Sequence, residues 1–186
     1  MPSQIAYIKR SSETLHDVAG DVITLLKQAG ETIGVAESLT GGGIMTAITS
    51  VSGASAVFRG GVVSYATPLK ARLLDVDTAL IAQHGVIHED VARQMAIGAR
   101  NVTTINDEPT TWGIGTTGVA GPSSQDGKPV GMVFIGIASP SEALALGPFH
   151  FPGVRHHVRQ ATIMEALAQL REILRARSDK EVAEPA

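Results

Sequence analysis

The segment Thr32-Ile-Gly-Val-Ala-Glu-Ser-Leu-Thr-Gly-Gly-Gly43 indicates the fold class most clearly. Residues 32–36 form a short apolar run that is typical of a buried strand. The residues after Gly43 favour a short helix that ends near Ser50, so the three glycines lie in a tight turn between strand and helix. A strand, a glycine turn and a helix in succession indicate the α/β class.

In the rest of the chain, the apolar periodicity predicts four more helices and four more strands. The first helix covers residues 12–29, with Ser11 or Ser12 as its N-cap and Gly30 as its stop. Pro68 opens another helix, which runs through Lys70 and Leu74. The remaining predicted helices cover 88–103 and 154–177, and the remaining strands cover 60–65, 111–117, 130–138 and 144–151.

The length of 186 residues, 44% of them hydrophobic and 18% charged, fits one globular domain with one sizeable core. We expect this domain to cover residues 12–177. Residues 1–11 are expected to be an N-terminal extension, and the polar residues 178–186 a disordered tail.

The composition also excludes several classes of protein. Without cysteine, the chain has no disulfide, no thiol nucleophile and no thiolate metal site. The net charge of −3 and the lack of a basic stripe argue against a nucleic-acid partner. No apolar run reaches the ~18 residues that a membrane span needs, and the chain does not open on a secretory signal, so we expect a cytoplasmic protein.

Glycine is distributed unevenly along the chain. Of the 20 glycines, six lie between Gly41 and Gly61 and seven between Gly113 and Gly136. Glycine tolerates positive φ and lets the backbone approach a ligand closely, so the two windows predict two parts of a binding site.

Three familiar motifs fail in their context. Gly113-Ile-Gly-Thr-Thr-Gly118 matches the dinucleotide fingerprint, but Gly121 and Pro122 follow where a helix would have to begin. The run 121–128 resembles a P-loop, but it is one residue too long and lacks the magnesium-binding hydroxyl. Tyr65 and Lys70 are one residue too far apart for the reductase Y-x-x-x-K pair. The histidine spacings match no metal motif.

What remains is a group of hydroxyl side chains and one lysine in or beside the glycine windows. Because loops at the carboxyl ends of neighbouring strands converge on one crevice, these side chains are expected to share a site. A hydrolase built from them needs a serine or threonine that is activated by Lys70, whose pKa must fall toward neutrality before it can act as a base. Tyr65 is placed to relay the proton. The group consists of Ser38, Thr40, Ser55, Tyr65, Lys70, Thr116 and Thr117.

Five motifs in order give the chain a specific resemblance. They are Ala36-Glu-Ser-Leu-Thr-Gly-Gly42, Phe58-Arg-Gly60, Val63-Ser-Tyr65 with Lys70 five residues on, Thr117-Gly-Val-Ala-Gly-Pro122 and Lys128-Pro-Val-Gly131. In this order they resemble the carboxy-terminal domain family of CinA, the competence/damage-inducible proteins, over residues 12 to 175.

The resemblance implies a three-layer α/β/α sandwich on a mixed, mostly parallel sheet, and a homodimer. It also implies a nicotinamide mononucleotide amidohydrolase without metal or cofactor, which releases nicotinate mononucleotide and ammonia. On this basis Ser55 is the expected nucleophile, with Lys70 as general base and Tyr65 assisting; which serine attacks stays open. Ser38, Thr117 and backbone N–H groups would then stabilise the oxyanion.

The family pattern also suggests which residues bind the substrate. Arg155 or Arg159 is the expected substrate-side cation, and the helix that begins near Gly42 offers N–H groups to the substrate's phosphate or to the oxyanion. Thr40, Gly41, Gly42 and Gly118 complete the expected binding set.

The chain also departs from the family pattern. Ala66-Thr-Pro68 follows Tyr65 where relatives often have Ser-Asn, Leu39 stands where they often have cysteine, and the loop 123–127 lacks a frequent glycine pair. We also expect a stand-alone domain. The alternative is a nucleotide-binding or partner-binding module without turnover; a nucleic-acid accessory is disfavoured by the net charge.

Overall fold

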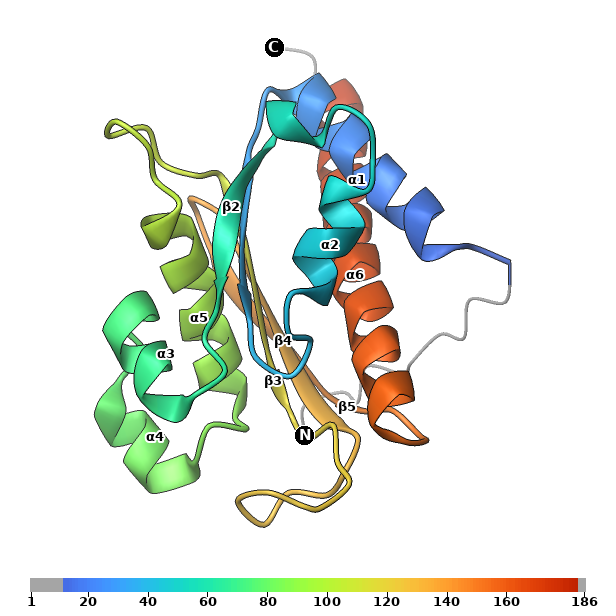
Figure 1. Ribbon diagram of the computed structural model, residues 1–186. Helices are drawn as coiled ribbons and strands as arrows, with labels where there is room; N and C mark the ends of the chain where they lie inside the picture. The colour runs from blue at the N-terminus through green and yellow to red at the C-terminus, as the bar shows by residue number, and fades with distance from the viewer. Residues whose placement is uncertain (1–11, 184–186) are drawn as a thin grey trace.

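A computed structural model describes residues 12–183, and within them the chain forms one α/β domain (Figure 1). Its elements in chain order are α1 (Leu15–Ala29), β1 (Ile33–Glu37), α2 (Gly43–Thr49), η1 (Ala54–Ala56), β2 (Phe58–Val63), α3 (Thr67–Leu74), α4 (Thr78–His84), α5 (Glu89–Val102), β3 (Trp112–Gly118), β4 (Met132–Ala138), β5 (Ala143–His150) and α6 (Arg155–Ala183).

The strands form one mixed sheet in the order β2-β1-β3-β4-β5. β1 pairs in parallel with β2 and β3, whereas β4 is antiparallel to both β3 and β5. Four of the five strands therefore point the same way, but the four pairings divide evenly between parallel and antiparallel. The expected mixed sheet is confirmed, and β4 is the strand that reverses direction.

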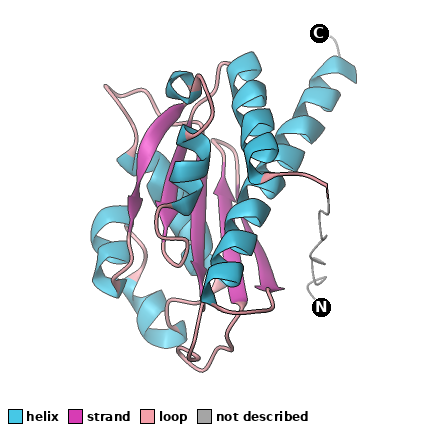
Figure 2. Cartoon of the chain, turned by 45° about the vertical axis from the view of Figure 1, so that its right-hand side comes forward, coloured by secondary structure: helices cyan, strands magenta, loops and turns pink. Residues whose placement is uncertain are grey.

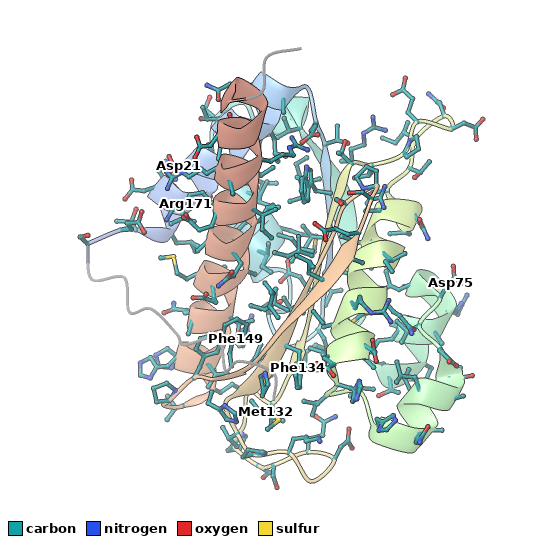
Figure 3. All side chains as sticks on the ribbon, turned by 180° about the vertical axis from the view of Figure 1, so that it is seen from behind. Asp21, Asp75, Met132, Phe134, Phe149 and Arg171 are labelled. Carbon is teal, nitrogen blue, oxygen red and sulfur yellow. The ribbon has the colours of Figure 1, made fainter. Side chains whose placement is uncertain are left out.

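Helices cover both faces of the sheet, which gives the three layers. In Figure 1, α3, α4 and α5 lie on one side of the strands and α1, α2 and α6 on the other, and the turned view in Figure 2 keeps the strands between helices. Figure 3 shows Phe149 on the α6 side of the sheet and Phe134 on the α5 side. Phe149 belongs to the larger apolar cluster with α1 and α6, and Phe134 packs with Val86, Ile87 and Ala92.

Much of the second glycine window serves helix–sheet packing. A Cβ atom on Gly113 would lie 2.0 Å from the Ala96 carbonyl oxygen of α5, and one on Gly136 would lie 2.0 Å from that of Ala92. Gly115 is equally constrained, 2.5 Å from the Ala92 oxygen. Glycine at these strand positions therefore lets α5 pack directly on the backbone of β3 and β4, so these residues are not walls of a binding site.

The structure also corrects several predicted boundaries. Thr14, not Ser11 or Ser12, caps α1, through a capping box with Asp17. The last helix continues to Ala183, so residues 178–183 are helical, not a disordered tail. α4 was not predicted, because no side chain in Thr78–His84 is buried and its apolar pattern is weak. The expected extension 1–11 and residues 184–186 lie outside the described residues.

Candidate active site

A polar cavity of about 110 Å³ lies at the carboxyl ends of β1, β2 and β3. These strands are parallel neighbours, so the loops that follow them meet at one edge of the sheet. The cavity is lined by Ser38, Leu39, Tyr65, Thr67, Lys70, Val86, Thr117, Gly118, Val119, Ala120, Gly121, Ser123, Gln125 and Arg155. Six of the expected site residues therefore line one cavity. They are Ser38, Tyr65, Lys70, Thr117, Gly118 and Arg155.

Ser38 and Lys70 form the chemical centre of this cavity. Lys70 Nζ lies 3.0 Å from Ser38 Oγ and donates a second hydrogen bond of 2.7 Å to the Ser64 carbonyl oxygen. The Ser64 carbonyl accepts one lysine hydrogen in either protonation state. When Lys70 is neutral, its lone pair is therefore free to accept the hydroxyl hydrogen of Ser38.

Burial prepares Lys70 for this role. Although its side chain belongs to a short helix, only 1% of the residue is exposed. The loss of solvation penalises the ammonium form and lowers the pKa of Lys70 from 10.5 to about 8. A lysine with a pKa near 8 loses its proton at the pH at which a general base operates.

Tyr65 and Arg155 lie at the mouth of the cavity. Tyr65 is 56% exposed, and its hydroxyl oxygen accepts a 2.5 Å hydrogen bond from Arg155 Nη2. Arg155 Nη1 donates to the Gly121 carbonyl oxygen at 2.8 Å. Neither acceptor is a carboxylate, and Arg155 forms no ion pair with a carboxylate of residues 12–179. The mouth therefore carries a positive charge that an anionic ligand can neutralise.

Thr117 and Gly118, at the end of β3, line the wall of the cavity opposite the Ser38 turn, but Thr117 cannot play its expected part. The Thr117 side chain is buried, and its hydroxyl donates a 2.6 Å hydrogen bond to the Val86 carbonyl oxygen. A hydroxyl has one hydrogen, so this one has none left for an oxyanion. Thr117 instead fixes the loop that carries Val86 against the cavity.

The N-terminus of α2 is not open to an anion, contrary to the sequence expectation. The fully buried Glu37 carboxylate accepts hydrogen bonds of 2.9, 3.2 and 2.9 Å from the backbone N–H groups of Gly42, Ile44 and Met45. These donors, which an anionic ligand would need, are thus already satisfied by the protein's own carboxylate. A signal was present in the sequence, since a glutamate directly before a glycine turn can reach the helix that follows.

Ser55, the expected nucleophile, lies at the opposite end of the sheet. It is exposed in η1, just before β2 begins, whereas Ser38 follows the last residue of β1. The parallel register pairs Ile33 with Phe58 and Glu37 with Val63. At ~3.3 Å per residue, Ser55 and Lys70 are separated by roughly one strand length, on the order of 15–20 Å. The structure therefore corrects the pairing of Ser55 with Lys70.

Other members of the expected binding set lie outside the cavity. Thr40 is buried, with its hydroxyl 2.9 Å from that of Thr116. Gly41, Gly42 and Arg159 line a different, open groove between α1 and α2. Ser123 and Gln125 of the β3–β4 loop also line the cavity, and neither was among the expected site residues. Their only signal was the glycine-rich loop in which they lie.

Among the side chains of residues 12–179, no group of three histidines, cysteines, aspartates or glutamates is placed to hold a metal ion. In the same range, no helix combines the length and apolar character that a membrane span requires.

Comparison with known proteins now decides the family. A family model described as the CinA C-terminal domain matches residues 15–174. The chain belongs to this family. A CinA-like protein of Frankia casuarinae is 43% identical over 155 residues, which are 83% of this chain and 34% of the relative. One of Parasynechococcus marenigrum is 41% identical over 163 residues, 87% of this chain and 38% of the relative. The chain therefore spans little more than a third of the curated relatives that it matches.

Solved structures of the CinA superfamily share the fold. A CinA superfamily protein from Klebsiella pneumoniae superposes with a TM-score of 0.82 at 25% identity, over 88% of this chain and 99% of that one. The competence/damage inducible protein CihA from Agrobacterium tumefaciens superposes with a TM-score of 0.79 at 29% identity, over 90% and 99%. The three-layer CinA fold and its mixed sheet are thus common to this chain and its structural relatives.

Proposed function

We propose that this CinA domain is an amidohydrolase that converts nicotinamide mononucleotide and water to nicotinate mononucleotide and ammonia. The observation that carries the proposal is the 3.0 Å contact between Ser38 Oγ and the buried amine of Lys70. A serine beside a base within hydrogen-bond reach is the arrangement of an activated nucleophile. The choice of nicotinamide mononucleotide rests on the resemblance to the CinA family.

In the proposed reaction, Ser38 is the nucleophile and Lys70 the general base. Ser38 Oγ bonds to the carboxamide carbon while Lys70 takes the hydroxyl proton. Collapse of the tetrahedral intermediate breaks the C–N bond, and Lys70 returns the proton to the departing nitrogen, so that ammonia leaves. Water then attacks the nicotinoyl ester of Ser38 and again transfers a proton to Lys70. The ester C–O bond then breaks and Lys70 gives this proton to Ser38 Oγ, which restores the serine and releases nicotinate mononucleotide.

The oxyanion of this reaction needs hydrogen-bond donors, and the hydroxyl of Thr117 is already committed. Leu39 and Ala120 both line the cavity. Neither backbone N–H donates a hydrogen bond to another described residue. We assign the oxyanion site to these two N–H groups, one from each wall.

Arg155 is the proposed contact for the substrate's phosphate. It lies at the exposed mouth beside Tyr65, where the nucleotide part of the substrate can remain while the carboxamide enters the cavity. A guanidinium matches the geometry of a phosphate, with two N–H groups for two oxygens.

The test is to measure ammonia release from nicotinamide mononucleotide and from nicotinamide riboside, which lacks the phosphate. We expect turnover of the mononucleotide and a KM at least about tenfold higher for the riboside, since one charge-assisted contact is lost. Arg155→Ala should raise the KM for the mononucleotide but leave that for the riboside nearly unchanged. Saturable binding of the mononucleotide without ammonia would contradict the proposal and favour a non-catalytic binding module.

A further inference from the structure

We propose that Arg159 is a positioning residue, which holds the nucleophile turn, Ser38–Gly42, in the conformation that directs Ser38 at Lys70. The proposal rests on the function proposed above in treating Ser38 as the nucleophile. It differs from the sequence expectation, in which Arg159 contacts the substrate.

The contacts of Arg159 join α6 to the two residues that follow Ser38. Arg159 Nε donates to the Leu39 carbonyl oxygen at 3.0 Å, and Nη2 donates to that of Thr40 at 2.7 Å. Guanidinium N–H groups are arranged in a rigid planar fork, so two carbonyls bound to one fork are fixed relative to each other. Because Arg159 does not line the cavity, it acts on the reaction through this turn.

The nucleophile turn is shaped to receive the guanidinium. Gly41 has φ +59°, and a Cβ atom there would lie 3.2 Å from Arg159 Nη2. The Gly41 N–H also donates to the Ser38 carbonyl oxygen at 3.1 Å, which closes the turn. Glycine at this position therefore allows both the left-handed backbone and the close approach of Arg159.

The first turns of α6 contact both walls of the cavity. Arg155 and Arg159 are four residues apart, so they project from the same side of the helix. Arg155 holds the β3–β4 loop through the Gly121 carbonyl, and Arg159 holds the nucleophile turn. Loss of Arg159 therefore removes the contacts to the nucleophile turn and leaves those of Arg155 intact. We expect it to change the position of Ser38 but not the mouth of the cavity.

The proposal is tested by the rate at which Ser38 reacts with a fluorophosphonate, followed by intact-protein mass spectrometry. In this reaction Ser38 Oγ bonds to phosphorus, fluoride leaves and Lys70 takes the serine proton. We expect Arg159→Ala to react about 10- to 100-fold more slowly, because a small displacement of a reacting group is costly. Arg159→Lys should be intermediate, since an ammonium cannot hold both carbonyls as a fork does. Millimolar guanidinium should partly restore the Ala variant.

Arg175→Ala is the matched control. Arg175 is on the same helix, but it pairs with Asp21 and Glu172 and does not line the cavity. Its reaction rate should equal that of the unaltered protein, and melting curves of all variants show whether each is folded. If Arg159→Ala does not fold, Arg159→Lys alone decides, and a lysine variant that reacts at the full rate overturns the proposal.

Kinetics with nicotinamide mononucleotide distinguish a positioning role of Arg159 from a substrate-binding role. Positioning predicts a lower kcat with KM changed less than about threefold, whereas substrate binding predicts a higher KM with kcat and labelling unchanged. The second result overturns the proposal. If the unaltered protein labels at Ser38 but releases no ammonia, the proposed function fails, and the labelling rates still decide the role of Arg159.

Discussion

At the scale of single residues, Lys70 links the burial of the site to its chemistry. Its amine is held between the Ser64 carbonyl and the Ser38 hydroxyl, and only 1% of the residue is exposed. Desolvation lowers its pKa to about 8, so near neutral pH a useful fraction is unprotonated. The same burial that makes the charged form costly makes the neutral form available as a base.

This predicts how activity depends on pH. Protonated Lys70 cannot accept the Ser38 proton, so activity is low below the pKa and rises as pH increases through it. We expect kcat/KM to rise about tenfold per pH unit below pH 7 and to level off above a midpoint near 8. A profile of ammonia release that is flat between pH 6 and 9 would contradict this assignment.

At the scale of elements, glycines on β3 and β4 decide how closely α5 approaches the sheet. Three of these strand positions leave no room for a Cβ atom against the α5 backbone. Clustered glycines do mark close approach of the backbone, as predicted, but the partner is the α5 backbone and not a ligand. The composition of the GIGTTG stretch does not distinguish a packed helix from a bound ligand, because either one can approach the strand closely only where the strand has no Cβ atom.

The packing role of these glycines predicts opposite effects for two glycine-to-alanine changes. Gly136→Ala should lower the free energy of unfolding by about 1–3 kcal/mol, since its methyl group would overlap the Ala92 carbonyl. Gly20→Ala, in the interior of α1 with no atom within 4 Å of the added Cβ, should raise it by about 0.5–1 kcal/mol. Urea unfolding measures both, and a Gly136→Ala midpoint equal to that of the unaltered protein would contradict the packing account.

At the scale of the whole molecule, the direction of the parallel strands determines which residues share the site. Ser38 and Tyr65 follow the ends of β1 and β2, and they lie on the cavity as the strand-end rule predicts. Ser55 precedes β2, so the same rule, applied to the predicted strand 60–65, would have placed it at the far end. The family motif and the strand rule conflicted at Ser55, and the strand rule agrees with the structure.

Other parts of the site could not be predicted from the pattern of residues. That Thr117 gives its only hydrogen to the Val86 carbonyl depends on the direction of its side chain, which no sequence pattern contains. The sequence predicted Arg159 as a cation near the site. It did not indicate that Arg159 would bind the backbone carbonyls of Leu39 and Thr40. Residue type and strand order predict which residues lie near the cavity, whereas hydrogen-bond geometry decides the role of each residue.

The proposed reaction requires that Ser38, not Ser55, is the nucleophile of this domain. The direct measurement compares the rates of ammonia release from nicotinamide mononucleotide by Ser38→Ala, Ser55→Ala and the unaltered protein. We predict that Ser38→Ala loses at least about a thousandfold in kcat, as removal of a nucleophile does, and that Ser55→Ala stays within about twofold. Full activity of Ser38→Ala, or loss of activity in Ser55→Ala alone, would show that Ser38 is not the nucleophile.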